Sequence, residues 1–400
     1  MDDISLRAAN KKGLLDTMQD TEALLCAALS GFNPAWPVAG DADFTAGFLE
    51  RSVYHGVQPL FHYLVKSDQA IALGWPQAVL EEFHWQAIAW TMWELRHQAL
   101  LKQVLELLAG MGIQPVLFKG TALAYSLYPG PALRSRGDTD LIVSLEDRVR
   151  VAEALEGLGF MREAGVSGDF ISYQASFTLT EANGSSHSLD LHWRINNSQL
   201  LARLFSYEEL RSRAQALPEL SPHAFAASRV DALLLACMHR SGHKRSPYYV
   251  DGVAHYSGDR LIWVYDIHLL ARRLTRDEWH EFMSRATQKS LRAVCLEGLS
   301  LAQTCFSTPI ASAVMEGLAR PGQPEPIAQY MESSAVRRLW LDFCAIDGWK
   351  SKLGFLTEYL FPPASYMHQK YRDAGSTWLP WLYLRRMKDG VIKRLKCGGE

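Results

Sequence analysis

Residues 115–143 read PVLFKGTALAYSLYPGPALRSRGDTDLIV, and this stretch decides the fold. The apolar run IQPVLF at 113–118 predicts a short buried strand, and TALAYSLY directly after it predicts a helix. The segment DTDLIVSL at 138–145 predicts a second strand. A buried strand that breaks into a helix at a Lys-Gly pair, with another strand following, indicates a small α/β unit.

The same alternation continues to about residue 206. The segment DRVRVAEALEGLGF predicts an amphipathic helix that ends at Gly159. Two further strands are predicted, ISYQASFTLT at 171–180 and SHSLDLHWRI at 186–195, joined by the polar turn EANGSS. Residues 111–206 therefore form the expected mixed-sheet core.

Helical periodicity dominates on both sides of this core. From residue 21 to 109 it runs through EALLCAAL, FLERSVYHGVQPLFHYLV and WTMWELRHQALLKQVLELLAG, and the last helix ends at Gly110 or Gly112. From Tyr207 onward the helical segments are DALLLACMHRSGH, RLIWVYDIHLLARRL, EWHEFMSRATQKSLRAVCLEGLSLAQTCF and SAVRRLWLDFCAI, with PGQPEP at 321–326 as a loop. The expected fold is α+β and predominantly helical, with regions 1–110 and 207–400 flanking the core.

Bulk composition narrows the class of protein. Four hundred residues exceed what one hydrophobic core usually organises, so two or three structural units are expected. Forty-three acidic and forty-one basic residues nearly cancel, and no charge signature indicates a nucleic-acid or membrane partner. Only residues 385–396 are locally basic, which favours a solvated helix end over a patch that contacts phosphate or a membrane.

Cysteine usage and the N-terminus indicate a cytoplasmic protein. The six cysteines are far apart and contain no Cys-x-x-Cys, which is typical of reduced thiols. The start MDDISLRAANKKG lacks the pattern of a signal peptide, and no apolar run reaches about 18 residues, so no membrane span is expected.

Asp138 and Asp140 form the first candidate site. Side chains at i and i+2 of a strand leave the same face, so the two carboxylates converge. Without a cation they would repel, and such a pair is suited to a hard divalent ion. An isolated Asp-x-Asp is nevertheless common at strand ends and is a weak signal.

Lys119, Gly120 and Thr121 form the second candidate, a phosphate site. Gly120 would let the backbone approach a triphosphate, the first amides of the helix point outward, and the Thr121 hydroxyl and Lys119 ammonium would add donors. An ordinary strand-to-helix turn with Thr121 as N-cap is the favoured reading of this segment taken alone.

Asp190 is the third candidate. In SLDLHW, Leu189 and Leu191 face one side of a strand while Asp190 and His192 face the other. A carboxylate here would complete a triad with the Asp pair, and the alternative is an exposed strand residue.

In combination these elements resemble the DNA polymerase beta nucleotidyltransferase superfamily, and more closely its uncharacterised bacterial nucleotidyltransferase family. The glycine motif Lys-Gly-x-Ala-Leu is matched by residues 119–123, and the metal motif Arg-x-x-x-Asp-x-Asp-Leu-φ-Val, where φ is apolar, by residues 134–143. The strand Asp-Leu-His-Trp stands at 190–193. Similar segments also flank the core: HGVQPL from His55, MHRSGHKR with RLIWVYDIHLL, and LFPPASYMHQKY followed by WLPWLYLRR.

The resemblance implies transfer of a nucleoside monophosphate from an NTP to an acceptor hydroxyl. Asp138 and Asp140 would hold two Mg²⁺ ions, with Mn²⁺ as a substitute, and Asp190 would share one ion and help to deprotonate the hydroxyl. Lys119, Gly120 and Thr121 would position the phosphates, and the C-terminal helices would close over the nucleotide.

Two features depart from the superfamily pattern. Its usual glycine-serine pair is Gly120-Thr121 here, which keeps the hydroxyl, and the insert YPGPALRSRG lengthens the connection to the Asp pair. Arg134, within this insert, would either contact the triphosphate or pair with the Asp cluster, and both alternatives stay open.

His239 and His243 lie four residues apart and share a helix face. The residues between them lack the Glu of a zincin, so His-Glu-x-x-His chemistry is excluded. By the resemblance they would line the nucleotide cleft with Lys244 and Asp266, and the alternative is solvated helix residues. The Trp-rich segments 85–98 and 378–386 have helical spacing, which favours core positions over base-stacking platforms.

The sequence contains no Walker, Rossmann or Gly-x-Ser-x-Gly fingerprint. No motif therefore supports a kinase, dehydrogenase or hydrolase function. The alternative to an enzyme is a catalytically silent nucleotide-binding or regulatory protein on the same fold. The acceptor is not determined by the sequence and would be a small molecule or a protein.

Overall fold

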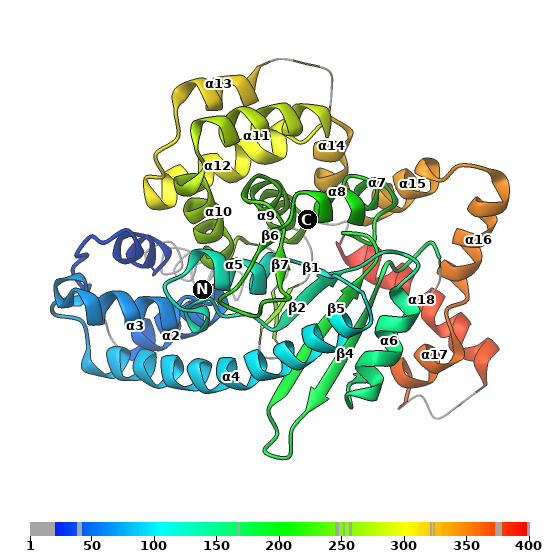
Figure 1. The fold of residues 1–400 in the computed structure, drawn as a ribbon, viewed down its shortest axis with the longest axis horizontal. Coiled ribbons are helices and arrows are strands. Elements are labelled where there is room, and N and C mark those ends of the chain that lie inside the picture. Colours follow the sequence, from blue (N-terminus) through cyan, green and yellow to red (C-terminus); the bar gives the residue numbers. More distant parts are fainter. Residues whose placement is uncertain are drawn as a thin grey trace, which may run out of the picture. The chain divides into compact units, whose positions relative to one another are not determined.

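The computed structural model describes residues 21–37, 42–165, 169–244, 248–250, 253–255, 258–320, 322, 325–372 and 378–397. Within these ranges the protein is an α+β, helix-rich fold with a mixed seven-stranded sheet (Figure 1). The chain divides into two compact units: residues 1–100, 119–136 and 229–321 in the first, and residues 101–118, 137–228 and 322–400 in the second.

This division follows packing rather than chain order. The core expected at 111–206 contributes its first helix and the following connection to the first unit and its strands to the second. The long helix α4, Gln77–Gly110, has its first 24 residues in one unit and its last ten in the other. The division of the sequence into three consecutive domains therefore stays a prediction.

The first unit is almost entirely helical. Helix α10 packs against α9 and α12, and α5 packs against both α9 and α10. Its elements, besides a helix at 21–29 and the first part of α4, are α2 Ala42–His55, α3 Gln58–Ser67, η1 Gln69–Ala72, α5 Lys119–Leu127, η2 Pro131–Leu133, α9 Arg229–His243, β8 Tyr248–Val250, β9 Val253–His255, α10 Leu261–Arg273, α11 Arg276–Gln288, α12 Arg292–Phe306 and α13 Ser312–Ala319.

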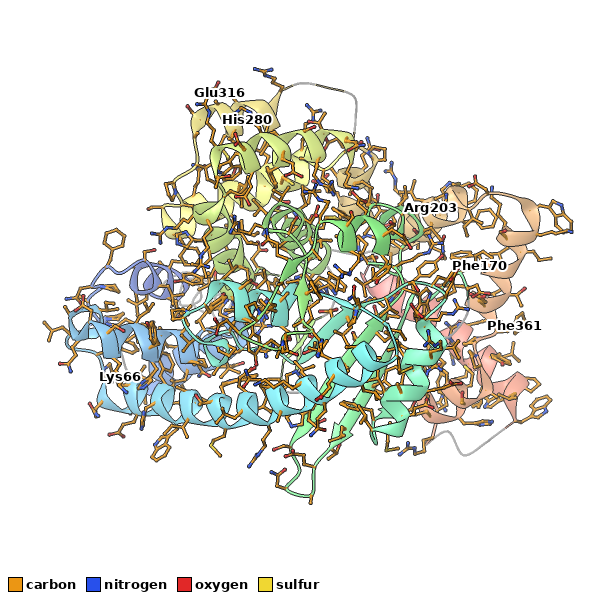
Figure 2. The ribbon with its side chains drawn as sticks, viewed as in Figure 1. Lys66, Phe170, Arg203, His280, Glu316 and Phe361 are labelled. Carbon is orange, nitrogen blue, oxygen red and sulfur yellow. The ribbon has the colours of Figure 1, made fainter. Side chains whose placement is uncertain are left out.

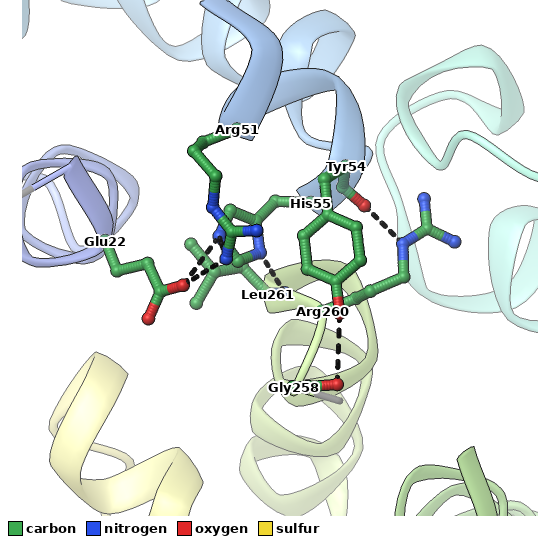
Figure 3. A network of polar contacts seen from close by, with 7 residues as sticks. All are labelled: Glu22, Arg51, Tyr54, His55, Gly258, Arg260 and Leu261. Atoms are coloured by element: carbon green, nitrogen blue, oxygen red, sulfur yellow. Dashed lines mark hydrogen bonds and ion pairs between the residues drawn. The ribbon is translucent and has the colours of Figure 1, made fainter. Parts of the chain in front are cut away.

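Two sequence segments far apart in the chain meet in this unit. The Leu261 amide donates a hydrogen bond to Nδ1 of His55 over 3.1 Å, and Nε of Arg260 donates to the Tyr54 carbonyl (Figure 3). A Cβ at Gly56 would lie 2.7 Å from the Arg260 guanidinium, and Gly56 has a φ of +66°. His55 therefore caps the start of α10, and the segments HGVQPL and RLIWVYDIHLL meet in the fold.

The second unit is built on the seven-stranded sheet, in the order β3-β4-β5-β2-β1-β7-β6. The pairs β2·β5 and β1·β7 are parallel and the others are antiparallel. The strands are β1 Val116–Phe118, β2 Asp138–Ile142, β3 Met161–Arg162, β4 Gln174–Thr180, β5 Ser186–His192, β6 Gln215–Ala216 and β7 Phe225–Ala226.

Alternation along the strands separates the two faces of this sheet. Leu117, Leu141 and Leu189 are fully buried on one face, while Asp140 and Asp190 leave the other. The helices of the unit are α6 Arg148–Gly157, which packs against β5, α7 Gln199–Ala202, α8 Tyr207–Ser212, α14 Pro326–Glu332, α15 Ala335–Ala345, α16 Trp349–Leu360, α17 Ala364–Lys370 and α18 Leu379–Cys397.

The sequence predicted a purely helical region after Tyr207, and this prediction is wrong. Two-residue strands β6 and β7 extend the sheet, and β8 pairs with β9. The long helical pattern at 278–306 is two helices, because Ser290 takes a left-handed φ of 56° between α11 and α12. The proposed loop PGQPEP lies partly outside the described residues, and its last proline begins α14.

The expectation that the Trp-rich segments are core is wrong for several residues. Trp85, Trp378 and Trp381 are 63%, 66% and 49% exposed. Helical spacing locates one face of a helix, but it does not say that a neighbour covers that face. In the part of the chain that the structure describes, no helix combines the length and apolar content needed to cross a membrane.

Candidate active site

Asp140 and Asp190 form the centre of the site in the second unit. They are register partners on the parallel strands β2 and β5, and both side chains leave the same face of the sheet. Asp140 is 3% exposed, and Asp190 is half-buried. Two carboxylates on adjacent strands at low exposure require a compensating charge or strong hydrogen bonds.

His192 supplies one such hydrogen bond. Its Nε2 lies 2.8 Å from Oδ1 of Asp140, and both side chains are buried. Because an ionised carboxylate only accepts, the imidazole is the donor. The ring is fixed by an edge-to-face contact with Phe118 at 5.0 Å between centroids. His192 therefore orients the Asp140 carboxylate.

Gln174 and Ser176 donate the corresponding hydrogen bonds to Asp190. Oγ of Ser176 donates to one carboxylate oxygen over 2.6 Å, and Nε2 of Gln174 donates to the other over 3.0 Å. Both donors come from β4, where Ser176 is the register partner of Asp190. Two neutral donors stabilise the charged carboxylate without neutralising it.

Asp138 lies two residues before Asp140, at the start of β2, and it is exposed. Its strand position puts it on the face of Asp140 and Asp190, as the i, i+2 spacing predicted.

These side chains fit a divalent cation. Asp140, Asp190 and His192 each offer a ligand atom, and the three atoms lie within 4.8 Å of one another. Carboxylate oxygens are the ligands that Mg²⁺ and Mn²⁺ prefer, and an imidazole bonded to a ligand carboxylate commonly orients it. The arrangement can therefore hold a hard cation.

Lys119, Gly120 and Thr121 open helix α5 in the first unit. Lys119 has a φ of 58°, a left-handed conformation that is uncommon for a residue with a side chain. A Cβ at Gly120 would lie 2.9 Å from Nη1 of Arg134, so glycine admits that guanidinium. Thr121 is fully buried, and its hydroxyl accepts a hydrogen bond from Nε of Arg136 over 2.8 Å.

Arg136 belongs to a buried network under α5. Its Nη2 lies 2.6 Å from Oε2 of Glu94, and Tyr125 donates to Oε1 of Glu94 over 2.6 Å. Burial, then the charge of Glu94, raises the pKa of Tyr125, so the phenol keeps its proton. The network holds Thr121 in place and engages the hydroxyl that the sequence had suggested for phosphate.

Arg134 forms an ion pair with Asp266 of α10, with Nη2 2.7 Å from Oδ2. Tyr128 donates to Oδ1 of the same carboxylate over 2.8 Å. Burial, and after it the charge of Asp266, raises the pKa of Tyr128 well above its ordinary range. The ion pair of Arg134 is with Asp266, an acid outside the Asp138–Asp140 cluster that one of its two alternatives had named.

A small cavity in the first unit brings several of the expected residues together. Its lining includes Lys119, Arg134, His239 and Asp266, with Trp263 beside them. The rings of His239 and His243, one turn apart, are tilted against each other with 4.4 Å between centroids, and both rings contact Trp263.

Lys244, predicted to line the cleft with these histidines, pairs with Glu297 of α12.

A second, larger cavity of about 1000 Å³ lies in the second unit. Gln174 and Ser176, the two donors to Asp190, line it. Trp193 lines it as well, and the Arg148 guanidinium lies 5.4 Å from the Trp193 ring. The cavity thus adjoins the hydrogen-bond partners of a candidate metal ligand.

Gln174, Ser176 and His192 were not among the site residues predicted from the sequence. His192 was detectable because it shares the strand face of Asp190. Gln174 and Ser176 carried no signal, since their role depends on the register between β4 and β5.

Comparisons with known proteins found a family model and a solved structure that are similar to this chain. The family model of the uncharacterised nucleotidyltransferases matches residues 45–307. No curated protein matches the chain. Among solved structures, an antigenic nucleotidyltransferase-like protein from Paracoccidioides brasiliensis is 13% identical with a TM-score of 0.33, covering 55% of this chain and 96% of its own. The matched residues span more than half of the sequence, and the chain belongs to the uncharacterised nucleotidyltransferase family.

Proposed function

We propose that the protein is a metal-dependent nucleotidyltransferase that moves a nucleoside monophosphate from an NTP to an acceptor hydroxyl. In this reaction the hydroxyl oxygen bonds to the α-phosphorus, the bond to the β-phosphate oxygen breaks, and pyrophosphate leaves. The observation that carries the proposal is the pairing of Asp140 with Asp190 in a group whose ligand atoms lie within 4.8 Å.

Asp138, Asp140 and Asp190 would hold two divalent ions, Mg²⁺ or Mn²⁺. Bound ions would offset the negative charge of the triphosphate and of the leaving pyrophosphate. His192 orients Asp140 through its hydrogen bond, and Asp190 accepts the proton of the attacking hydroxyl or binds the ion nearest to it.

Lys119, in the first unit, stays a sequence-based prediction for a contact with nucleotide phosphate. Its left-handed φ directs the chain from β1 into α5, and strained backbone of this kind is concentrated at functional sites. Thr121 is left out of the phosphate site, because its buried hydroxyl already bonds Arg136.

The acceptor is more consistent with a small molecule than with a protein. The cavity of about 1000 Å³ has the size of small-molecule sites, and the partners of Asp190 line it. Trp193 offers an aromatic surface and Gln174 and Ser176 offer polar groups, a combination that suits a compact hydroxylated acceptor.

A thermal-shift experiment tests the proposal. Wild type, Asp140→Asn and Asp347→Asn are heated with each of the four NTPs, in Mg²⁺ or in EDTA. Asp347 is a matched control, because it is a 92% exposed acid outside the site. At about a hundred times its dissociation constant, a nucleotide stabilises by roughly 2.7 kcal/mol, a shift of several degrees.

The proposal predicts a Mg²⁺-dependent shift in wild type and Asp347→Asn that is lost in Asp140→Asn. A Mg²⁺-dependent shift of the same size in all three proteins would contradict the assignment of Asp140. Binding without turnover would instead favour the silent nucleotide-binding alternative.

A further inference from the structure

The helices at the C-terminal end of the second unit expose large apolar side chains in helical register. On α16, Trp349, Leu353, Leu356 and Leu360 follow the spacing i, i+4, i+7 and i+11, and they are 71%, 56%, 40% and 36% exposed. This spacing places them on one face of the helix. Phe361, labelled in Figure 2 at the end of α16, is 52% exposed.

Helix α18 and the residue before it repeat this feature. Trp378, Trp381 and Leu384 are exposed and lie three residues apart, on one face. The opposite face is packed, because Leu382 is 1% exposed in a cluster with Met367 of α17 and with Tyr371, the residue after that helix. The exposed residues are thus the outer side of a docked helix.

Hydrogen bonds fix α16 and α18 to one another. Arg386 donates to the Tyr359 carbonyl over 2.7 Å, and the Tyr383 hydroxyl donates to the Pro362 carbonyl over 2.9 Å. The rings of Phe361 and Tyr383 meet edge to face at 5.4 Å. The two apolar faces therefore belong to one rigid element, called here the α16–α18 surface: residues 349, 353, 356, 360, 361, 378, 381 and 384.

The excess of positive charge around this surface indicates an anionic partner. Residues 349–397 contain ten Lys and Arg but three Asp and Glu, in a chain whose net charge is −2. Among them, Arg385 and Lys388 are exposed on α18 next to Leu384. Exposed Trp and Leu flanked by Lys and Arg on a helix lying along the surface is the composition of interfacial helices, which bind anionic lipid headgroups.

We propose that the α16–α18 surface docks the protein on an anionic lipid bilayer. Trp378, Trp381 and Leu384 enter the headgroup region, and Arg385 and Lys388 contact the lipid phosphates. The α16 face adds Trp349 and Leu353. Docking of this kind is peripheral and needs no membrane-spanning helix.

Co-sedimentation of the full chain with vesicles tests this proposal. The vesicles are phosphatidylcholine alone, or phosphatidylcholine with about a third phosphatidylserine, a composition near that of anionic leaflets. The protein should sediment with the anionic vesicles only, and binding should weaken as salt rises, because the headgroup attraction is screened.

Two variants, each with a matched control, separate the apolar and charged contributions. Trp381→Ser with Leu384→Ser should abolish vesicle binding, whereas Trp85→Ser, which removes an exposed Trp on α4, should leave it unchanged. Arg385→Glu with Lys388→Glu should weaken binding by about fivefold or more for each cation removed. The control is Lys66→Glu with Lys102→Glu, which changes the same number of exposed charges elsewhere.

Light scattering on the same proteins measures whether a second copy of the chain, rather than a bilayer, occupies the surface. Absence of wild-type binding to either kind of vesicle would overturn the proposal. Unchanged vesicle binding by Trp381→Ser with Leu384→Ser would also overturn it. So would a concentration-dependent wild-type dimer that these substitutions dissociate, since a second copy of the chain would then cover the surface.

Discussion

Asp140 on β2 and Asp190 on β5 are register partners in a parallel strand pair, so the strands themselves bring the two carboxylates together. The sequence places them fifty residues apart, with a helix and two strands between them. Each carboxylate has its own hydrogen-bond donors, His192 for Asp140 and Ser176 with Gln174 for Asp190. These separate sets of partners allow the two contributions to be tested one at a time.

Replacing His192 should weaken metal binding. His192→Ala removes the 2.8 Å hydrogen bond to Asp140, and loss of such a partner typically lowers metal affinity about 10- to 100-fold. Titration of Mn²⁺ followed by electron paramagnetic resonance gives the dissociation constant. His192→Gln, which keeps a donor, should recover part of the affinity.

The control for this change is His223→Ala, an exposed histidine outside the site. Equal Mn²⁺ affinity in wild type and His192→Ala would show that His192 does not position Asp140.

Replacing Ser176 tests the other carboxylate. Ser176→Ala removes the 2.6 Å bond to Asp190, and losing a hydrogen bond to a charged group costs roughly 1.5–3 kcal/mol. The result should be a rise of about tenfold or more in the Mn²⁺ dissociation constant. Thr178→Ala is matched, because Thr178 lies on the same face of β4 and bonds Glu163 instead. Similar Mn²⁺ dissociation constants in the two variants would argue that Ser176 affects metal binding by its place in β4 and not by its hydrogen bond to Asp190.

Gly120 should tolerate no side chain. A methyl group there would meet the Arg134 guanidinium, which is held by Asp266, and overpacking of this kind costs roughly 1–3 kcal/mol. Urea denaturation of Gly120→Ala should show this loss. Gly130→Ala is the control, since no atom lies within 4 Å of its added Cβ. Equal stability of Gly120→Ala and wild type would mean that Arg134 moves aside freely.

Stability should depend on the protonation of His268. Its Nδ1 lies 2.9 Å from Thr308 Oγ1, and burial, followed by the charge of Arg272, lowers the pKa of His268 to about 4. The unfolded chain binds the proton near its ordinary pKa of about 6.5. The free energy of unfolding should therefore be level above pH 6.5 and fall as the pH drops toward 4, by up to about 1.4 kcal/mol per unit.

Denaturation of His268→Gln over this range should show a smaller slope than wild type. His280→Gln, at the exposed histidine labelled in Figure 2, should keep the wild-type slope. An unchanged slope in His268→Gln would assign the pH dependence to other groups.

The sequence predicted the elements that are long or periodic. The strands β1, β2, β4 and β5 and the helices α5, α6, α9 and α10 all occur where the pattern placed them, with shifted ends. Strands β6 and β7 were missed because two residues carry no periodicity. Their existence depends on a tertiary contact, in which Ala226 pairs with Leu117 more than a hundred residues earlier.

The candidate site was predictable where chemistry and strand alternation coincide. The shared strand face of Asp138, Asp140 and Asp190 was predictable because residues at alternate strand positions leave the same face. The roles of Thr121 and Gly120 could not be read from the sequence, since both depend on arginines of the following connection. Arg136 engages the Thr121 hydroxyl, and Arg134 fills the space above Gly120.

Pyrophosphate release from NTPs in Mg²⁺ is the measurement that tests the central claim most directly. Even with water as a slow acceptor, wild type should release pyrophosphate, EDTA should stop the release, and Asp140→Asn and Asp190→Asn should each lower the rate at least about a hundredfold. Asp347→Asn should match wild type. No release by wild type that binds Mg²⁺ and nucleotide, or equal rates in wild type and Asp140→Asn, would contradict nucleotidyl transfer at this carboxylate pair.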